Sequence, residues 1–249
     1  MRVLTRLDIK GSNIVKTVRT EGLRVVGNPK ELAERYYQEG ADELVYMDIV
    51  ASLYQRNLDF DQLKAVSENI FIPLTAGGGI RSLHDIGMAL RSGADKVAIN
   101  TYAIKDPEFI RKAAEIYGSQ CIVLSIEAKK ISEGKWEAYT DGGRERTGVD
   151  VIEWIKKGIL LGAGEIMLTS IDADGTRDGY DIELIREAIA HSSVPVIVHG
   201  GAGTPADIVK AAQAGAEAVS ASSIFHYSLS SFTQVKDALA EAGYQIRTL

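Results

Sequence analysis

The sequence predicts a single (β/α)8 barrel, the α/β fold also called a TIM barrel, with a two-fold half-barrel repeat. Short apolar runs typical of buried strands alternate with amphipathic segments of helical period. Residues 72–101 align with residues 194–223 at a constant offset of 122, and nine of the thirty positions are identical. Composition does not change between the halves, so we expect one domain over 1–249, made of half-barrels of about 1–122 and 123–249. A doubly wound open sheet competes, but it gives no reason for a two-fold repeat of four strand–helix units.

Eight strands are expected, and most are followed by a helix. Their apolar runs are VLTRLDI (3–9), ELVYMDI (43–49), IPLTA (72–76), KVAIN (96–100), CIVLSI (121–126), EIMLTSI (165–171), VPVIV (194–198) and AVSAS (218–222). The helix expected over 29–40 has Pro29 near its first turn and Gly40 after its end. Another begins after Thr204, a good N-cap residue, and ends before Gly215.

Composition excludes several classes of function. The net charge of −6 gives little support to a nucleic-acid partner. No apolar run approaches the roughly 18 residues that cross a bilayer, and the N-terminus shows no signal-peptide pattern. The single cysteine, Cys121, lies in an apolar run, where a small buried strand residue is expected, and it is compatible with a reducing compartment. We therefore expect a cytoplasmic protein with no membrane partner.

Two short stretches, RLDIKG (6–11) and SIEAKK (125–130), each place an acidic residue at the end of a predicted strand. In a barrel, functional groups gather at the C-terminal ends of the strands. Asp8 and Glu127 would then face each other across the barrel mouth from the first and fifth strands. One such acid often only meets solvent, but two at equivalent positions favour general acid–base catalysis, in which one donates a proton and the other accepts one.

The repeat also contains two glycine-rich strand ends, AGGGIRS (76–82) and HGGAGTP (199–205). Each precedes a helix, and each is followed by a small polar strand end, INT or ASS. Glycine exposes backbone N–H groups and a helix N-terminus attracts anions, so each set is a candidate phosphate site. The ligand is then expected to be long, with a phosphate at each end. The four histidines lack ligand-like spacing, and neither glycine cluster matches a dinucleotide fingerprint, so we expect no metal and no cofactor. His199 could face the ligand, although packing is its more common role.

Over its whole length the chain resembles the cyclase subunit family of imidazole glycerol phosphate synthase. The resemblance is carried by DIKGSNIVK, DELVYMDIVAS, GGGI, GADKVAINT, GAGEIMLTSIDADGT, GYD and HGGAG. It implies a duplicated half-barrel that receives ammonia from a partner glutaminase docked at the N-terminal face. The implied substrate is a bis-phosphorylated ribulosyl-formimino aminoimidazole carboxamide ribonucleotide. The implied products are imidazole glycerol phosphate and aminoimidazole carboxamide ribonucleotide.

The resemblance also implies roles for individual residues. Asp8 and Glu127 occupy the general acid–base positions. The substrate and phosphate positions are Lys16, Asp48, Gly79, Asn100, Thr101, Thr169, Ser170, Asp174, Gly175, Gly200, Gly201, Ser222 and Ser223. Arg2, Glu43, Lys96 and Glu165 match a charged ring that gates ammonia entry, and such a ring could equally be a structural salt-bridge cluster.

Two residues depart from the family pattern, which usually has aspartate at Glu127 and cysteine at Arg6. Arg6 lies two residues before Asp8 and is therefore expected to point into the barrel, where a buried guanidinium needs an acidic partner. We predict that it pairs with Asp8, Glu127 or Asp48 and that pairing lowers the pKa of that carboxyl. The segment 129–148 predicts a hairpin whose Trp136 and Tyr139 either cover the substrate or only pack the hairpin.

Two other functions remain open. A cyclase-like paralogue could deliver glutaminase-derived ammonia for sugar amidation in surface-glycan biosynthesis, and the substituted catalytic carboxylate suits such a protein. The related ribonucleotide isomerase, which needs no ammonia, is disfavoured by GADKVAINT and by the charged ring.

Overall fold

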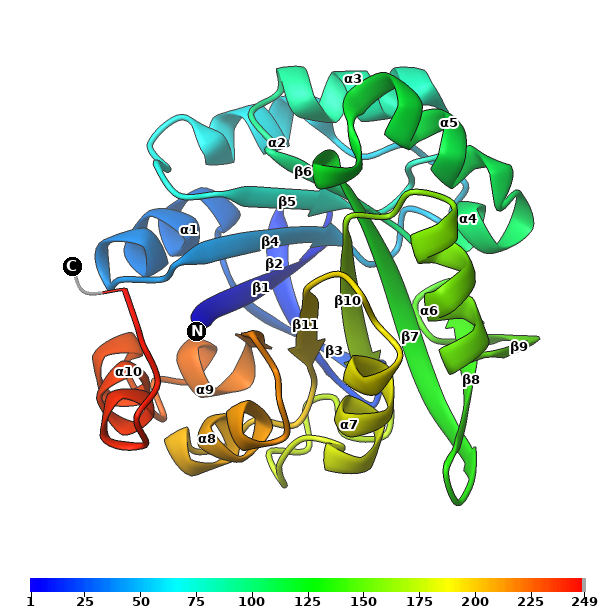
Figure 1. The fold of residues 1–249 in the computed structure, drawn as a ribbon. Helices are drawn as coiled ribbons and strands as arrows, with labels where there is room; N and C mark the ends of the chain where they lie inside the picture. The colour runs from blue at the N-terminus through cyan, green and yellow to red at the C-terminus, as the bar shows by residue number, and fades with distance from the viewer. Residues whose placement is uncertain (248–249) are drawn as a thin grey trace.

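Eight parallel strands close into a barrel in the computed structural model, which describes residues 1–247 (Figure 1). Each strand pairs with the next, and the pairings of β10 with β7 and of β12 with β1 complete the ring. The barrel strands are β1 (Arg2–Lys10), β4 (Glu43–Asp48), β5 (Leu74–Gly77), β6 (Lys96–Ile99), β7 (Ile122–Ser132), β10 (Glu165–Ser170), β11 (Val196–His199) and β12 (Ala218–Ala221). The predicted (β/α)8 barrel is confirmed.

Helices cover the outside of the barrel (Figure 1). They are α1 (Pro29–Gln38), α2 (Phe60–Ser67), α3 (Leu83–Arg91), α4 (Thr101–Lys105), α5 (Glu108–Tyr117), α6 (Val151–Leu160), α7 (Ile182–Ala190), α8 (Pro205–Gln213), α9 (Ser223–His226) and α10 (Phe232–Glu241). The predicted Thr204 cap is present, because its side chain accepts a hydrogen bond from the N–H of Asp207 at the start of α8. The prediction that the fifth strand starts at Cys121 was wrong by one residue, because β7 starts at Ile122. Cys121 ends a short 3-10 helix (Ser119–Cys121) that follows Gly118, and it is only half-buried.

Two antiparallel hairpins extend the first and fifth barrel strands. The first is β2 (Asn13–Val18) with β3 (Glu21–Gly27), and the second is β8 (Lys135–Thr140) with β9 (Glu145–Asp150). The hairpin predicted over 129–148 is confirmed as the antiparallel pairing of the end of β7 with β8, to which β9 adds a further strand. Its Trp136 is fully buried and donates from Nε1 to Asp181 at 3.0 Å, so this ring packs the hairpin. The β2–β3 hairpin was not predicted, because β3 (EGLRVVG) is largely exposed and has no buried face that would produce an alternating pattern.

Features repeated at the offset of 122 support the duplication, which stays a prediction. Ser82 and Thr204 form capping boxes at the starts of α3 and α8. Two grooves at the N-terminal end of the barrel, of about 360 and 370 Å³, have eight lining residues each. The first groove contains Phe71 and the second contains Ser193. Each lining residue of the first groove corresponds to a lining residue of the second that lies 122 positions later, and Phe71 corresponds to Ser193 in this way.

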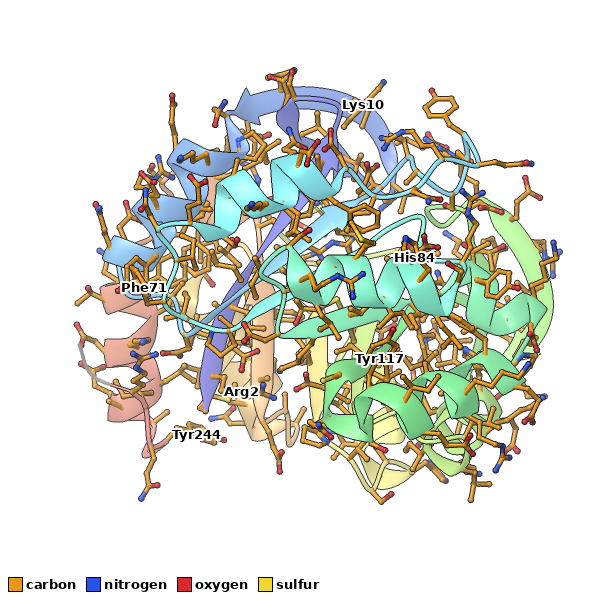
Figure 2. All side chains as sticks on the ribbon, turned by 90° about the horizontal axis from the view of Figure 1, so that it is seen from above. Arg2, Lys10, Phe71, His84, Tyr117 and Tyr244 are labelled. Carbon is orange, nitrogen blue, oxygen red and sulfur yellow. The ribbon has the colours of Figure 1, made fainter. Side chains whose placement is uncertain are left out.

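Side chains inside the barrel form layers, because alternate residues of each strand point inward. The lowest layer is charged and lies at the Arg2 end of β1; Figure 2 labels Arg2 and Lys10 at the two ends of this strand. Above it is an apolar cluster of Leu4, Val45, Met47, Ala98, Val123, Met167, Ile197 and Ala218. The mouth, with Arg6 and then Asp8, lies above this apolar layer on the same face of β1. No helix within residues 1–247 has the length and apolar character needed to cross a membrane.

Candidate active site

Asp8 and Glu127 come together at the barrel mouth. Asp8 is 3% exposed on β1, and Glu127 is 9% exposed on β7. Both line one small cavity of about 30 Å³ on the barrel axis, together with Thr169 and His199. We call it the central cavity. It places two buried carboxyls where a reacting group could lie between them.

Arg6 points into this cavity with a buried side chain, as predicted. Its Nε donates to Asp8 Oδ1 at 2.7 Å, and its Nη1 donates to Thr169 Oγ1 at 3.3 Å. The predicted acidic partner of Arg6 is therefore Asp8. Asp48 instead pairs with Arg56, whose Nη1 lies 2.7 Å from its Oδ2.

The pKa of Asp8 lies below its ordinary value. Burial alone would raise it, but the charges of Arg6 and Lys16 and the Arg6 hydrogen bond outweigh burial. Lys16 Nζ lies 3.7 Å from Asp8 Oδ2, so each oxygen of this carboxylate faces a cation. Asp8 is therefore ionised at neutral pH.

Glu127 has the opposite shift. Burial raises its pKa to about 7, and the charge of Arg6 opposes this only in part. Asn100 Nδ2 donates to its Oε2 at 3.2 Å. Two carboxyls that differ in this way are the usual arrangement of a base and an acid in one site. Glu127 is thus partly protonated at neutral pH and can donate a proton.

A larger cavity of about 370 Å³ adjoins the central cavity on the side of β4, β5 and β6. It is lined by Asp48, Gly79, Asn100, Thr101 and two cations that sequence reasoning missed, Arg81 and Lys105. Gly79 adopts a φ of 73°, and a Cβ there would collide with the carbonyl oxygen of Arg56. The glycine cluster and the cations make this cavity suitable for a phosphate. The signal for Arg81 was present in the sequence, because it directly follows GGGI.

The second glycine cluster surrounds a much smaller cavity of about 10 Å³. Its predicted residues line it together: Lys16, Asp174, Gly175, Gly200, Gly201, Ser222 and Ser223. The buried Lys16 Nζ lies 2.8 Å from Asp174 Oδ1, and Thr17 Oγ1 donates to Asp174 Oδ2 at 3.1 Å. These bonds attach the β2–β3 hairpin to the turn after β10. Ser170, predicted with Thr169, instead closes that turn by accepting from the N–H of Ala173 at 3.4 Å.

His199 lies between the central cavity and this second cavity and lines both. Its Nδ1 lies 3.1 Å from Ser220 Oγ, and its Nε2 lies 3.7 Å from Asp174 Oδ1. Burial, helped by the charge of Arg6, lowers its pKa to about 3. His199 is therefore neutral at physiological pH. Among residues 1–247, no group of three or more His, Cys, Asp or Glu side chains could hold a metal ion.

The four predicted gate residues form a closed ring of ion pairs at the opposite end of the barrel. Arg2 lies 2.6 Å from Glu43 and 2.7 Å from Glu165, and Lys96 lies 3.0 Å and 2.7 Å from the same two carboxylates. These side chains come from the N-terminal ends of β1, β4, β6 and β10. The ring closes the bottom of the barrel whether or not ammonia passes through it.

A family model described as histidine biosynthesis protein matches residues 2–230. A relative from Legionella pneumophila is 58% identical over 82% of this chain and 96% of its own length. Relatives from Streptomyces griseus and Dehalococcoides mccartyi are each 48% identical over 99% of this chain and 98% or 97% of their own. All three carry the curated name imidazole glycerol phosphate synthase subunit HisF.

Proposed function

Because the chain belongs to the histidine biosynthesis protein family, we propose that it is the cyclase subunit of imidazole glycerol phosphate synthase. In this role it uses ammonia to convert a bis-phosphorylated ribulosyl-formimino aminoimidazole carboxamide ribonucleotide. The products are imidazole glycerol phosphate and aminoimidazole carboxamide ribonucleotide. The reaction places the protein in histidine biosynthesis and, as we further propose, in the cytoplasm.

The observation that carries this proposal is the pair of unlike carboxyls in one cavity. Ring closure needs a proton to leave the attacking ammonia nitrogen as its C–N bond forms. It also needs a proton to reach the nitrogen that departs as the other C–N bond breaks. Asp8, held ionised, accepts the first proton, and Glu127, with a pKa of about 7, supplies the second.

Each of the two glycine clusters is proposed to bind one of the substrate's two phosphates. One phosphate is held beside Gly79 in the larger cavity, and the other beside Gly201 near Lys16. The carbon atoms that react then lie in between, beside Asp8 and Glu127. Because the second cavity is small, substrate entry requires the β2–β3 hairpin, which carries Lys16, to move outward.

The proposed source of ammonia is a glutaminase subunit at the N-terminal face of the barrel. Below the mouth, the barrel interior is apolar, and under this layer lies the ring of Arg2, Glu43, Lys96 and Glu165. Neutral ammonia crosses an apolar layer at less cost than ammonium, because burying an unpaired charge is far more expensive than burying a small polar molecule. The ring would then open to admit ammonia and exclude ammonium.

Turnover of the bis-phosphorylated substrate with excess ammonium salt tests the proposal, because this assay needs no partner subunit. We expect turnover by the natural chain and a loss of about 10²–10⁴-fold in Asp8→Asn, which removes the general base. Absence of turnover by the natural chain at any ammonium concentration would contradict the proposal. The same would follow if Asp8→Asn were fully active.

A second candidate function, delivery of ammonia for sugar amidation, is favoured by Arg6. Its guanidinium fills space at the reacting centre and pairs with Asp8. In that function the chain would complete glutamine-dependent amidation of a sugar in a separate enzyme and leave the ribonucleotide unchanged. Isomerisation of the ribonucleotide without ammonium would instead support the related isomerase.

A further inference from the structure

Arg6 accounts for the difference between the two carboxyls at the mouth. The side chain is 5% exposed and lines both the larger cavity and the central cavity. Its two hydrogen bonds go to different strands, to Asp8 on β1 and to Thr169 on β10. The guanidinium is planar and its donors are fixed in direction, so two bonds of this kind also fix the orientation of Asp8.

Glu127 has no comparable partner. Among the residues that the structure describes, no cation lies within 4.0 Å of its carboxyl, and its side-chain hydrogen bond comes from the neutral amide of Asn100 at 3.2 Å. Two buried carboxyls without a cation beside either would share one proton, and neither would have a fixed role. A cation bonded to one of them alone removes this ambiguity.

We propose that Arg6 is a positioning residue for proton transfer, which holds Asp8 as the proton acceptor and leaves Glu127 as the proton donor. The inference rests on the proposed function, since it concerns the same acid–base pair. Arg6 acts through Asp8 in this role.

The other charged or titratable groups around Asp8 come from several elements. They are Lys16 on β2, Glu127 on β7, Arg144 in the turn between β8 and β9, Asp174 after β10, His199 on β11 and His226 on α9. Burial lowers the pKa of His199 to about 3 and that of His226 to about 4, so neither changes its charge near neutral pH. Lys16 is shared with Asp174, to which it is closer, at 2.8 Å against 3.7 Å for Asp8. Arg6 is therefore the cation bonded most closely to Asp8.

The test compares the pH dependence of ammonium-driven kcat/KM in the natural chain, Arg6→Met and Arg6→Lys. Methionine removes the charge at similar length, and lysine keeps the charge without the planar donors. In Arg6→Met we expect the acidic limb to move up by about one to three pH units, because a neighbouring opposite charge lowers a carboxyl pKa by that amount. At the optimum of the natural chain, activity falls at least about tenfold, mainly through kcat. In Arg6→Lys the charge remains, so the acidic limb of the kcat/KM profile should stay near its original pH. The planar donors are lost, so kcat should fall.

Lys236→Met is the matched control. Lys236 makes a buried ion pair with Asp42 at 2.6 Å, at the N-terminal end of the barrel and far from the mouth. Losing this pair should lower the thermal unfolding midpoint without moving the acidic limb of the kcat/KM profile. Partial unfolding of the control would lower its activity by the same factor at every pH. If Arg6→Met also lowers activity by one factor at every pH, without moving the acidic limb, the positioning role is overturned.

A second measurement separates this inference from the proposed function. Carbon-13 NMR of the side-chain carboxyls follows the titration of Asp8 in the free protein and needs no substrate. We expect the Asp8 midpoint to lie at higher pH in Arg6→Met than in the natural chain. If the natural chain shows no ammonium-driven turnover, the proposed function fails, yet the titration still decides the effect of Arg6 on Asp8. An unchanged Asp8 midpoint overturns the inference, whatever the turnover.

Discussion

The mouth of the barrel is wide in its first half and nearly filled in its second. Beside Gly79 there is a cavity of about 370 Å³, whereas the cavity beside Gly201, at the equivalent strand end, measures about 10 Å³. The backbones of the two regions are alike, since both glycines have positive φ and a capping box follows each cluster. The difference lies in the side chains, because the buried Lys16–Asp174 pair occupies the second region, whereas the Asp48–Arg56 pair beside the first is partly exposed.

The comparison shows how a repeated backbone can support an asymmetric reaction. Glycine conformation and helix capping, which place anion-binding N–H groups, depend on the backbone and recur in both halves. Proton transfer needs two unlike groups, and here the two carboxyls differ because Arg6 is bonded to Asp8, whereas Glu127 is buried without a cation bonded to it.

Replacing Glu127 with Gln should have the largest effect. Glutamine keeps the size of the side chain but cannot donate the proton, so ammonium-driven kcat should fall by about 10²–10⁴-fold. The pKa of Glu127 is raised to about 7, so an acid that must be protonated loses activity as the pH rises through about 7. The alkaline limb of the natural chain should therefore lie near that pH and be absent from the residual activity of Glu127→Gln.

Asn100→Ala is the control for this substitution. It removes the hydrogen bond to Glu127 but leaves the carboxyl, so the alkaline limb should persist. If the limb of the natural chain also persists in Glu127→Gln, the limb belongs to another group and Glu127 is not the acid.

Breaking the Lys16–Asp174 pair should destabilise the fold more than breaking an ion pair of the first region. Lys16→Met leaves the buried Asp174 carboxylate without its closest cation, and we expect a loss of about 3–5 kcal/mol in the free energy of unfolding. Arg56→Met breaks a pair with Asp48 in which the Arg56 side chain is 37% exposed and the Asp48 side chain only 3% exposed. Water can reach the position that the guanidinium leaves, so we expect a smaller loss, of about 1–3 kcal/mol. Urea denaturation of each variant measures both values.

The double variant Lys16→Met/Asp174→Asn sharpens this result. Removing both charges avoids the unpaired carboxylate, so most of the lost stability should return. Equal losses in Lys16→Met and Arg56→Met would show that burial does not distinguish the two pairs.

The sequence was sufficient for the features that depend on backbone pattern. Strand alternation placed Asp8 and Arg6 on one face, the glycine clusters located both phosphate candidates, and Thr204 was identified as a helix cap. The pairing of Arg6 with an acid also followed, because a buried guanidinium requires one.

Features that depend on contacts between distant segments could not be predicted. Asp48 pairs with Arg56, which comes from the loop after β4, and no strand pattern indicates this contact. The small second cavity depends on the β2–β3 hairpin, whose strand β3 is exposed and lacks a buried face. Its Lys16 contacts Asp174, 158 positions away in the chain. A pattern of period two or 3.6 contains no information about such contacts.

The two grooves at the N-terminal end allow the proposed glutaminase site to be tested. Phe71 is 77% exposed in the first groove, toward the Arg2 end of β1 (Figure 2), and its equivalent in the second groove is the polar Ser193. An exposed aromatic at an interface is a common hot spot, for which truncation costs about 2 kcal/mol or more. Phe71→Glu should therefore weaken binding of the glutaminase subunit by at least about 30-fold, as measured by isothermal titration calorimetry.

Ser193→Glu is the matched control, because it adds the same charge at the equivalent position of the other groove. If the partner is anchored at Phe71, this variant should change the Kd by less than Phe71→Glu. Equal weakening by the two variants would show that both grooves contact the partner. No weakening by either would place the glutaminase elsewhere.

The smallest expected difference concerns the capping boxes, where the two halves are most alike. Ser82 and Thr204 each accept a hydrogen bond from the N–H of an aspartate, Asp85 and Asp207, which bonds back to the cap. Ser82→Ala and Thr204→Ala should each lower the free energy of unfolding by about 1 kcal/mol, and by similar amounts, in urea denaturation. Since α3 and α8 follow the two glycine clusters directly, equal values would show that the two proposed phosphate sites are followed by helices whose caps contribute equally to stability. The asymmetry of the mouth would then come from the side chains of Arg6, Lys16 and Asp174 and not from the backbone. A clearly larger loss of stability in one half would show that the helices also contribute to the asymmetry.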